Sequence, residues 1–293
     1  HWCNPAFPGH LACMFMTKKG RVAMFTHLKK FFAATAVALA VLPAMAADTL
    51  KIGVLPGAYA DAIHAAAKDA KAQGLEVKVV EFTDWTTPNV AVDSGDLDIN
   101  FFQHQPFLDN AVKKNGFKLT SAGTSFLANV GLYSLKHKTV DAVPTNGKVG
   151  IANDPVNQGR GLLLLQKAGL IKLKPEVGFL GTLDDIVENP KKLSFVEVEG
   201  PQLVRITGDV DIAQGFPYFI LASKAFDATK ALALTSYEDD SWAIQFVARS
   251  DKAADPRIAQ FLAVYKNSPA VRQTIHQFYQ GEQKLYRLAW LKK

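Results

Sequence analysis

The residues best suited to bind a small anion lie where a strand-like segment runs directly into a helix-like one. Residues 148–152 have the apolar pattern of a strand, and the Asn-Asp-Pro sequence at 153–155 supplies a helix cap followed by a first-turn proline. Free N–H groups and the dipole at such a helix start favour an anion. Arg160 lies within the first two turns and is able to form two parallel hydrogen bonds with a carboxylate, and Asn157 shares its face of the helix.

This motif indicates a small anion such as a carboxylate, because the glycine spacing of a phosphate-binding loop is absent from it. Asn157 and Arg160 would then act together as the residues that hold the anion. A capped helix with a solvated Arg160 is the alternative interpretation, and the residues alone favour neither.

Aromatic residues form a second candidate site. Trp85 lies in the sequence FTDWTTP, and Phe102 and His104 lie in NFFQHQPF. Both segments follow predicted strand ends, where α/β sheets bind ligands. Aromatic faces and a neutral imidazole would enclose an apolar or sulfur-containing side chain. We assign Trp85, Phe102 and His104 to ligand binding, and we interpret Phe101 and Phe107 as core residues.

Residues that could perform catalysis or bind a metal are sparse. His64 follows Asp61 by three residues but has no nucleophile motif or second ligand beside it. Three pairs of acidic residues lack the spacing of a metal site: Asp96 with Asp98, Asp184 with Asp185, and Asp239 with Asp240. The sequence therefore predicts no catalytic residue, no metal and no cofactor. An exported enzyme that uses His104 as a base on a small carboxylate is a second, disfavoured hypothesis.

Strand-like and helix-like segments alternate along the chain, which predicts an α/β fold. The expected strands cover residues 49–55, 75–82, 97–101, 130–135, 148–152, 195–198, 210–213 and 243–248. The expected helices cover residues 59–72, 88–94, 107–114, 156–168, 256–266 and 269–279. The first strand-helix-strand unit requires a parallel pair with a right-handed crossover.

These segments predict two α/β lobes joined by two crossing stretches, near residues 135–138 and 240–243. Lobe I is expected to comprise residues 47–137 and 242–293, because the C-terminal helices return to it. Lobe II is expected to comprise residues 138–241. A single larger α/β domain is the alternative that the pattern leaves open.

Residues 24–46 have the features of a cleavable signal peptide. A basic start is followed by an apolar run at 31–42, and Ala44 and Ala46 supply the small residues at −3 and −1. The apolar run is shorter than the ~20 residues that a membrane span requires, so a retained anchor helix is the weaker alternative. We expect cleavage after Ala46 and a soluble, exported chain.

The residues before the expected cleavage site account for the basic charge of the sequence. Residues 1–23 hold both cysteines, Cys3 and Cys13, and we interpret them as an upstream leader of doubtful relevance. Residues 1–46 hold five of the 33 Lys and Arg residues and none of the 27 Asp and Glu residues. The remainder is therefore almost neutral and free of cysteine. It gives no indication of nucleic-acid binding, a disulfide framework or a lipid-anchored cysteine.

Five strings in the sequence carry a family resemblance: KIGVLPGA, FTDWTTPN, GDLDINFFQHQPFLD, NDPVNQGRGLLLLQKAGLIKL and DDIVENPKKLSFVEVEGPQL. Through them the chain resembles the methionine-binding (MetQ/NlpA-type) receptors of ABC importers, a family of lipoproteins that bind D- or L-methionine. The similarity runs from about Lys51 to the C-terminal helices.

The resemblance implies a two-lobed type II periplasmic-binding-protein fold, with two mixed sheets flanked by helices, that closes on its ligand like a hinged clamp. It implies that the ligand is delivered to an ABC permease and its ATPase. In the family the positions of Arg160 and Asn157 hold the ligand's carboxylate, while those of Trp85, where tyrosine is usual, Phe102 and His104 enclose its side chain. Because Ala47 stands where the family usually has a lipid-bearing cysteine, we expect a monomer free in the periplasm.

The chain departs from the family at two places near the expected site. An asparagine that helps to anchor the amino acid should fall at residues 215–218, where this chain reads Gly-Phe-Pro-Tyr, and we assign Tyr218 to the site in its place. The usual Tyr-Pro before the first crossing is Ala128-Asn129. A lost buried hydrogen-bond partner typically costs about 1–3 kcal/mol, which is enough to change the preferred ligand.

Methionine is therefore the first expectation for the ligand, and a different sulfur-containing or apolar carboxylate, such as an oxidised or derivatised methionine, is the alternative. A third hypothesis is a surface interaction protein that reuses the receptor fold. Under that hypothesis Phe216 or Tyr218 would fill the cleft.

Overall fold

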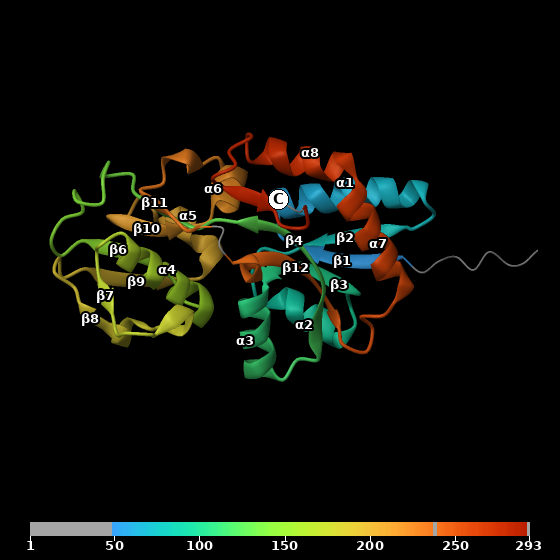
Figure 1. The fold of residues 1–293 in the computed structure, drawn as a ribbon, viewed down its shortest axis with the longest axis horizontal. Helices are drawn as coiled ribbons and strands as arrows, with labels where there is room; N and C mark the ends of the chain where they lie inside the picture. Colours follow the sequence, from blue (N-terminus) through green and yellow to red (C-terminus); the bar gives the residue numbers. More distant parts are fainter. Residues whose placement is uncertain (1–48, 237–238, 292–293) are drawn as a thin grey trace, which may run out of the picture. The chain divides into compact units, whose positions relative to one another are not determined.

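Two mixed β-sheets organise the computed structural model, which describes residues 49–236 and 239–291 (Figure 1). The expected leader at 1–23 and signal peptide at 24–46 lie outside the described residues. Within the described ranges, no helix has the length and apolar character needed to cross a membrane. The α/β class predicted from the alternating segments is confirmed.

The first sheet has six strands in the order β13-β4-β12-β3-β1-β2. Its strands are β1 (Leu50–Val54), β2 (Val77–Glu81), β3 (Ile99–His104), β4 (Leu119–Ala128), β12 (Ala243–Arg249) and β13 (Tyr286–Leu288). Strands β2 and β3 run parallel to β1 on its two sides, as the predicted strand-helix-strand unit requires. Strand β12 is antiparallel to both β3 and β4, and β13 is antiparallel to β4.

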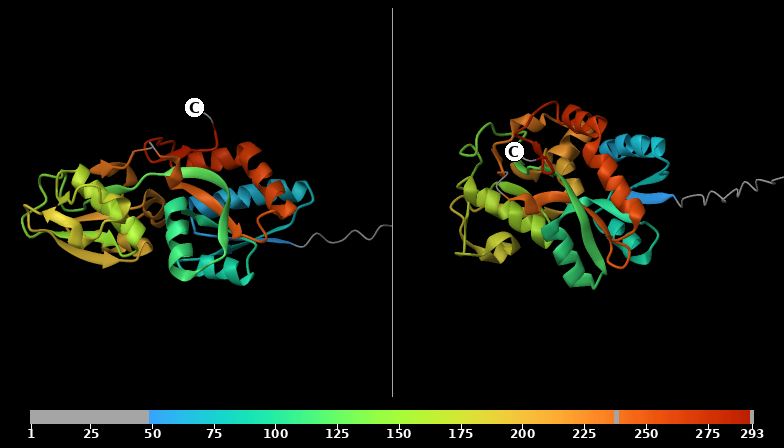
Figure 2. Two further views of the ribbon diagram at one scale, coloured as in Figure 1. Left: turned by 60° about the horizontal axis from the view of Figure 1, so that its bottom comes forward. Right: turned by 45° about the vertical axis from the view of Figure 1, so that its right-hand side comes forward.

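Helices cover both faces of this sheet. One face carries α1 (Ala58–Ala72), α7 (Pro256–Asn267) and α8 (Pro269–Phe278), and the other carries α2 (Thr87–Ser94) and α3 (Gln105–Asn115) (Figures 1 and 2). Strand β3 is consequently buried at each of its positions. Phe101 of β3 stacks on Phe246 at 4.4 Å between ring centroids, which confirms Phe101 as a core residue.

The second sheet has five strands in the order β11-β5-β10-β6-β9. Its strands are β5 (Gly131–Tyr133), β6 (Lys148–Ala152), β9 (Ser194–Val198), β10 (Ile212–Gly215) and β11 (Ala233–Leu234). Strands β10, β6 and β9 are parallel, and β5 is antiparallel to its neighbours β10 and β11. The helices of this part are α4 (Pro155–Lys167), α5 (Leu203–Ile206) and α6 (Pro217–Ser223), and a small hairpin pairs β7 (Lys172–Leu173) with β8 (Ile186–Glu188).

We call the six-stranded sheet with its helices lobe I and the five-stranded sheet with its helices lobe II. The chain passes from lobe I to lobe II between Ala128 and Gly131, and it returns between Leu234 and Ala243. The first passage therefore precedes the predicted crossing at 135–138. The predicted boundary after residue 137 assigned β5 to lobe I, whereas β5 belongs to the sheet of lobe II. Alternation of apolar residues identifies a strand but does not identify the sheet that the strand joins.

The longest strand in lobe I was missed. Strand β4 lies between β12 and β13, yet its first half reads Leu-Thr-Ser-Ala-Gly-Thr and lacks an alternating apolar pattern. Pairing on both edges holds it in place, with register shifts along β12 that accommodate irregular backbone. Sequence reasoning also missed short elements whose two or three residues carry no periodic signal: β7, β8, β11 and β13.

Candidate ligand-binding site

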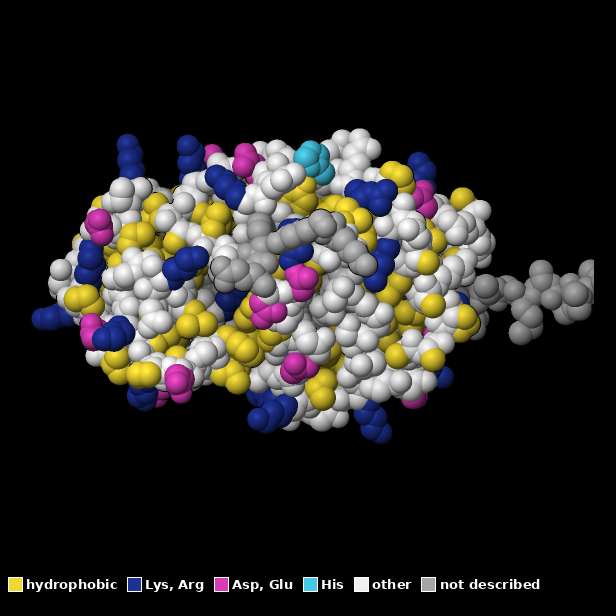
Figure 3. Space-filling view, in the orientation of Figure 1, with side chains coloured by type: hydrophobic (Ala, Val, Ile, Leu, Met, Phe, Trp, Pro, Cys, Tyr) yellow, Lys and Arg dark blue, Asp and Glu magenta, His cyan; other side chains and the backbone are white. Residues whose placement is uncertain are grey.

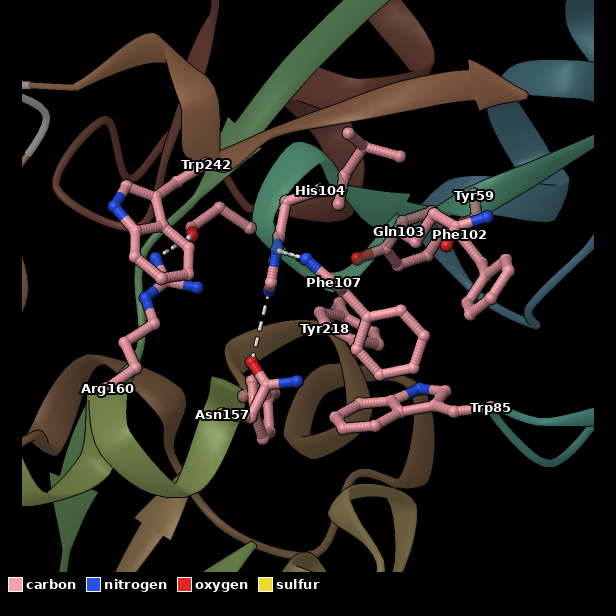
Figure 4. Close-up of a pocket in the computed structure, with 13 residues that line it drawn as sticks. Tyr59, Trp85, Phe102, Gln103, His104, Phe107, Asn157, Arg160, Tyr218 and Trp242 are labelled. Carbon is pink, nitrogen blue, oxygen red and sulfur yellow. Dashed lines mark hydrogen bonds between the residues drawn. The ribbon is translucent and has the colours of Figure 1, made fainter. Parts of the chain in front are cut away.

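A narrow pocket with a cavity volume of about 30 Å³ is lined by residues of both lobes (Figure 4). Lobe I contributes Tyr59, Trp85, Phe102, Gln103, His104, Phe107, Ala128 and Ile244. Lobe II contributes Asn157, Arg160, Phe216 and Tyr218, and Trp242 lies in the returning passage. The structure thus brings together all six residues that the sequence assigned to ligand binding: Trp85, Phe102, His104, Asn157, Arg160 and Tyr218.

Arg160 reaches the pocket from the second turn of α4. The helix starts as predicted: the Asp154 side chain accepts a hydrogen bond of 2.9 Å from the backbone N–H of Asn157. Arg160 is only 7% exposed, and its Nη2 donates a hydrogen bond of 3.3 Å to the Ala128 carbonyl. Among the ion pairs formed within residues 49–236 and 239–291, none includes Arg160.

The electrostatics of Arg160 favour an anionic ligand. Burial lowers the pKa of Arg160 to about 10, so that the guanidinium remains charged at neutral pH. A buried cation without a protein carboxylate carries a large desolvation cost, and a bound carboxylate would offset it. These properties favour the anion-binding interpretation of the helix start over a solvated arginine.

Trp242 is a pocket residue that sequence reasoning missed. It belongs to the short 3-10 helix η5 (Asp240–Trp242), and its ring lies 4.4 Å from the Arg160 guanidinium carbon. Its ring also meets the His104 ring edge to face, with centroids 4.7 Å apart. The sequence feature that could have identified it is its position: a large aromatic residue inside the expected second crossing, directly before a predicted strand.

A chain of hydrogen bonds joins the lobes through His104 and Asn157. The Nδ1 atom of His104 accepts from the backbone N–H of Phe107 at 3.2 Å. Its Nε2 atom must therefore carry the hydrogen, which it donates to Oδ1 of Asn157 at 3.1 Å. The Asn157 Nδ2 group in turn lies 3.2 Å from each carboxylate oxygen of Asp154. Figure 4 shows the central link between His104 and Asn157.

His104 is poorly suited to act as a base. Burial, reinforced by the nearby charge of Arg160, lowers the pKa of His104 to about 3. The lone pair of Nδ1 already accepts a hydrogen bond, and Nε2 is a donor. The imidazole is therefore neutral and fully engaged, which gives the enzyme hypothesis no support.

Aromatic side chains form the apolar end of the pocket (Figure 4). Trp85 lies in the loop between β2 and α2 and meets Phe107 edge to face, with ring centroids 6.0 Å apart. Phe102 meets the same Phe107 ring at 5.8 Å. Phe107, which the sequence assigned to the core, packs against the core and also lines the pocket from the first turn of α3.

Two tyrosines that belong to different lobes meet beside this aromatic end. Tyr59 of α1 and Tyr218 of α6 pack edge to face, with ring centroids 4.6 Å apart. Burial raises the pKa of both hydroxyl groups well above the usual range, so that both remain protonated. Trp85 Nε1 lies near the Tyr218 hydroxyl, yet it is buried and makes no hydrogen bond within the described residues.

The stretch that lacks the expected asparagine contributes aromatic rings to the pocket. Phe216 and Tyr218 line its wall. The preceding Gln214 points elsewhere: its Nε2 donates to the Asn157 carbonyl at 2.9 Å, and its Oε1 accepts from the Ala152 N–H at 3.0 Å. Gln214 therefore supports the start of α4 from behind and supplies no amide to the pocket.

Asn129 has a structural role in the first passage. Its Nδ2 donates to the Lys284 carbonyl at 2.8 Å, and its Oδ1 accepts from Thr235 Oγ1 at 2.9 Å. The backbones of Val130 and Thr235 are also hydrogen-bonded, at 2.9 Å. The two passages between the lobes are thus joined to each other and to the C-terminal segment.

The described residues contain no group of three His, Cys, Asp or Glu side chains arranged to hold a metal ion. On the face in Figure 3, Lys and Arg side chains are interspersed with Asp and Glu. That distribution differs from the clustered basic stripe that is typical of nucleic-acid binders.

Comparison with known proteins gives consistent matches. The family model described as NlpA lipoprotein matches residues 50–285. The D-methionine-binding lipoprotein MetQ of Yersinia pestis is 40% identical over 224 residues, which cover 76% of this chain and 83% of that protein.

Two solved structures extend this likeness to three dimensions. A nutrient binding protein from Burkholderia cenocepacia, bound to methionine, matches with a TM-score of 0.77 and 38% identity, and the match covers 83% of this chain and 100% of that one. A periplasmic substrate-binding protein of an ABC transporter from Coxiella burnetii matches with a TM-score of 0.75 and 32% identity, covering 82% and 100% of the two chains.

Proposed function

Because this chain belongs to the NlpA lipoprotein family, we propose that it is the methionine-binding receptor of an ABC importer and has no catalytic activity. The observation that carries the proposal is the buried guanidinium of Arg160, which lies against Trp242 and has no ion-pair partner among the described residues. A ligand carboxylate would supply the missing negative charge.

The arrangement of the pocket supports one orientation for the ligand. With the carboxylate on Arg160, an unbranched apolar side chain would extend toward Trp85, Phe102 and Phe107. A thioether makes favourable contacts with aromatic rings, so methionine suits that end.

We place the hinge of the clamp at the two passages between the lobes, where Asn129, Val130 and Thr235 are joined. The captured ligand would be handed to a membrane permease driven by an ATPase. The relatives are named lipoproteins or periplasmic proteins, and we propose the periplasm for this chain. We propose that the exported protein carries no lipid, because Ala47 stands where the family usually has a cysteine, and its mass tests this proposal.

Titration calorimetry with a ligand panel is expected to show one methionine bound per chain. Methioninol, which replaces the carboxylate with an alcohol, should bind at least roughly thirtyfold more weakly, because it leaves the buried charge of Arg160 unpaired. Norleucine, which has a methylene group in place of sulfur, should retain most of the affinity. Equal binding of methioninol and methionine would contradict the proposed carboxylate contact.

An oxidised methionine is the second candidate ligand. The Nε1–H of Trp85 favours it, because this buried group lies near the Tyr218 hydroxyl but makes no hydrogen bond within the described residues. Indole nitrogen is only a donor, and a thioether sulfur is a weak acceptor, whereas a sulfoxide oxygen is a strong one. If this candidate is correct, methionine sulfoxide binds tighter than methionine, and Trp85→Phe removes the difference. Tighter binding of methionine by the unaltered protein decides against the sulfoxide.

Trp242→Leu is expected to raise the Kd for methionine by roughly 3- to 30-fold. The substitution removes a cation–π contact with Arg160, worth about 0.5–2 kcal/mol. The same change at Trp290, which does not line the pocket and whose Nε1 donates to the Lys266 carbonyl at 3.0 Å, is the matched control. Calorimetry that shows equal losses in both variants would argue against a role for Trp242 in the site.

A further inference from the structure

Trp85 of lobe I packs against Gly200 of lobe II so closely that no side chain fits between them. A Cβ atom on residue 200 would lie 2.0 Å from Cη2 of the indole, 2.2 Å from Cζ3 and 2.7 Å from Cζ2. These three atoms are the far edge of the six-membered ring. Contacts of this length are far inside van der Waals separation, so either the indole or the lobe would have to move.

The backbone of Gly200 does not itself require glycine. Seven described glycines have positive φ, and Gly200 is not among them. Its φ therefore lies outside the left-handed region that favours glycine. What residue 200 provides is space, and the indole of the opposite lobe occupies that space.

Two phenylalanines of lobe II complete the seat of the indole. The Phe216 ring meets Trp85 edge to face at 5.2 Å, and the Phe219 ring lies nearly parallel to it at 6.2 Å. We call Gly200, Phe216 and Phe219 the Trp85 notch. Trp85 is only 7% exposed, and separation of the lobes would withdraw it from the notch. Burial of the indole is therefore coupled to closure of the clamp.

We propose that Gly200 is a positioning residue for ligand capture: because it has no side chain, Trp85 is able to seat in the notch, and this contact holds the closed arrangement around the ligand. The inference rests on the proposed function, in which the ligand is enclosed between the lobes. It gives Trp85 a second role, in which its outer ring fastens the lobes together beside the pocket that it lines.

A double-mutant cycle on residues 85 and 200 tests the proposal, with methionine affinity measured by calorimetry. Gly200→Ala should raise the Kd by roughly 10- to 100-fold, the usual effect of overfilling a packed contact. Trp85→Phe shortens the side chain and removes the ring edge that Cβ would strike. In that background Gly200→Ala should change the Kd by less than about twofold, because the obstruction is gone.

Two other glycines of lobe II provide controls. A Cβ on Gly208 would have Leu135 as its nearest neighbour, at 3.8 Å, so Gly208→Ala should leave affinity unchanged. A Cβ on Gly159 would lie 1.9 Å from the Phe179 carbonyl oxygen. Both residues belong to lobe II, so separation of the two lobes would not remove this clash. Gly159→Ala should therefore lower the melting temperature, whereas Gly200→Ala should scarcely change it.

Equal affinity of Gly200→Ala and the unaltered protein overturns the proposal and leaves the proposed function standing. The proposal is also overturned if Gly200→Ala raises the Kd by the same factor in the Trp85→Phe background as in the unaltered protein. If the unaltered protein binds no carboxylate of the panel, the proposed function fails. Small-angle scattering of the unaltered protein and of Gly200→Ala then tests whether Trp85 holds the lobes together. A larger radius of gyration for Gly200→Ala supports the fastening role of Trp85, and an equal radius overturns it.

Discussion

Arg160→Met is expected to weaken methionine binding by at least roughly thirtyfold while leaving the ligand-free protein as stable as before, or more stable. Truncating one partner of a buried, hydrogen-bonded charge pair typically costs about 2–5 kcal/mol. That range corresponds to a loss of roughly 30- to 5,000-fold in affinity. The loss is large because the ligand's carboxylate would enter a buried site with no charge to meet it.

The stability of Arg160→Met separates a binding role from a structural one. The guanidinium is buried, and no described carboxylate pairs with it, so an apolar side chain of similar length removes a desolvation cost. Methionine at this position would still contact the Trp242 ring. Thermal unfolding without ligand should therefore show an unchanged or higher melting temperature.

Arg205→Met is the matched control for this prediction, because Arg205 is exposed on α5 and lies outside the pocket. It should bind methionine like the unaltered protein. Arg160→Lys keeps the charge but loses the planar guanidinium group. Its affinity for methionine should therefore fall between that of the unaltered protein and that of Arg160→Met. Undiminished binding by Arg160→Met would refute the assignment.

Acidification is expected to destabilise the protein through His104. In the unfolded chain this histidine binds a proton near pH 6.5, whereas burial and the charge of Arg160 lower its pKa in the folded protein to about 3. Between these values the unfolded state holds more protons, so the free energy of unfolding falls as the pH falls. The contribution amounts to as much as about 1.4 kcal/mol for each pH unit below 6.5, and it is fully present above that pH.

His104→Gln should flatten this dependence, because glutamine does not titrate and retains a donor for Asn157. Burial raises the pKa of the neighbouring Asp154, an effect of opposite sign that His104→Gln leaves in place. Urea unfolding of both proteins at pH 7.5, 6.5 and 5.5 therefore isolates the part of the pH dependence that His104 contributes.

The matched control is His64→Gln, which replaces an exposed histidine outside the pocket and should not flatten the dependence. Identical slopes for His104→Gln and the unaltered protein would show that His104 does not stay neutral in the folded state.

Features of the site that depend on local sequence were predictable. Residues 153–155 fixed the start of α4, and the helical spacing then placed Asn157 and Arg160 on one face. The aromatic segments at strand ends indicated Trp85, Phe102 and His104 for the same reason, since strand ends of an α/β sheet meet at one edge.

Features that depend on contacts between distant segments were missed. Trp242 acquires its place only when the returning passage brings it beside α4. The position of the first passage was misplaced, because an apolar strand pattern is equally suited to either sheet. Gly200 lies in an ordinary Gly-Pro sequence, and its importance emerges only from the ring of the opposite lobe.

The central claim is that methionine lies between the lobes with its carboxylate on Arg160 and its sulfur at the aromatic end. A crystal structure with selenomethionine as the ligand tests this most directly, because selenium gives an anomalous signal at one atom. The account predicts a selenium peak beside Trp85, Phe102 and Phe107 and a carboxylate within hydrogen-bond distance of Arg160. A peak beside Arg160, or none in the pocket, would contradict it.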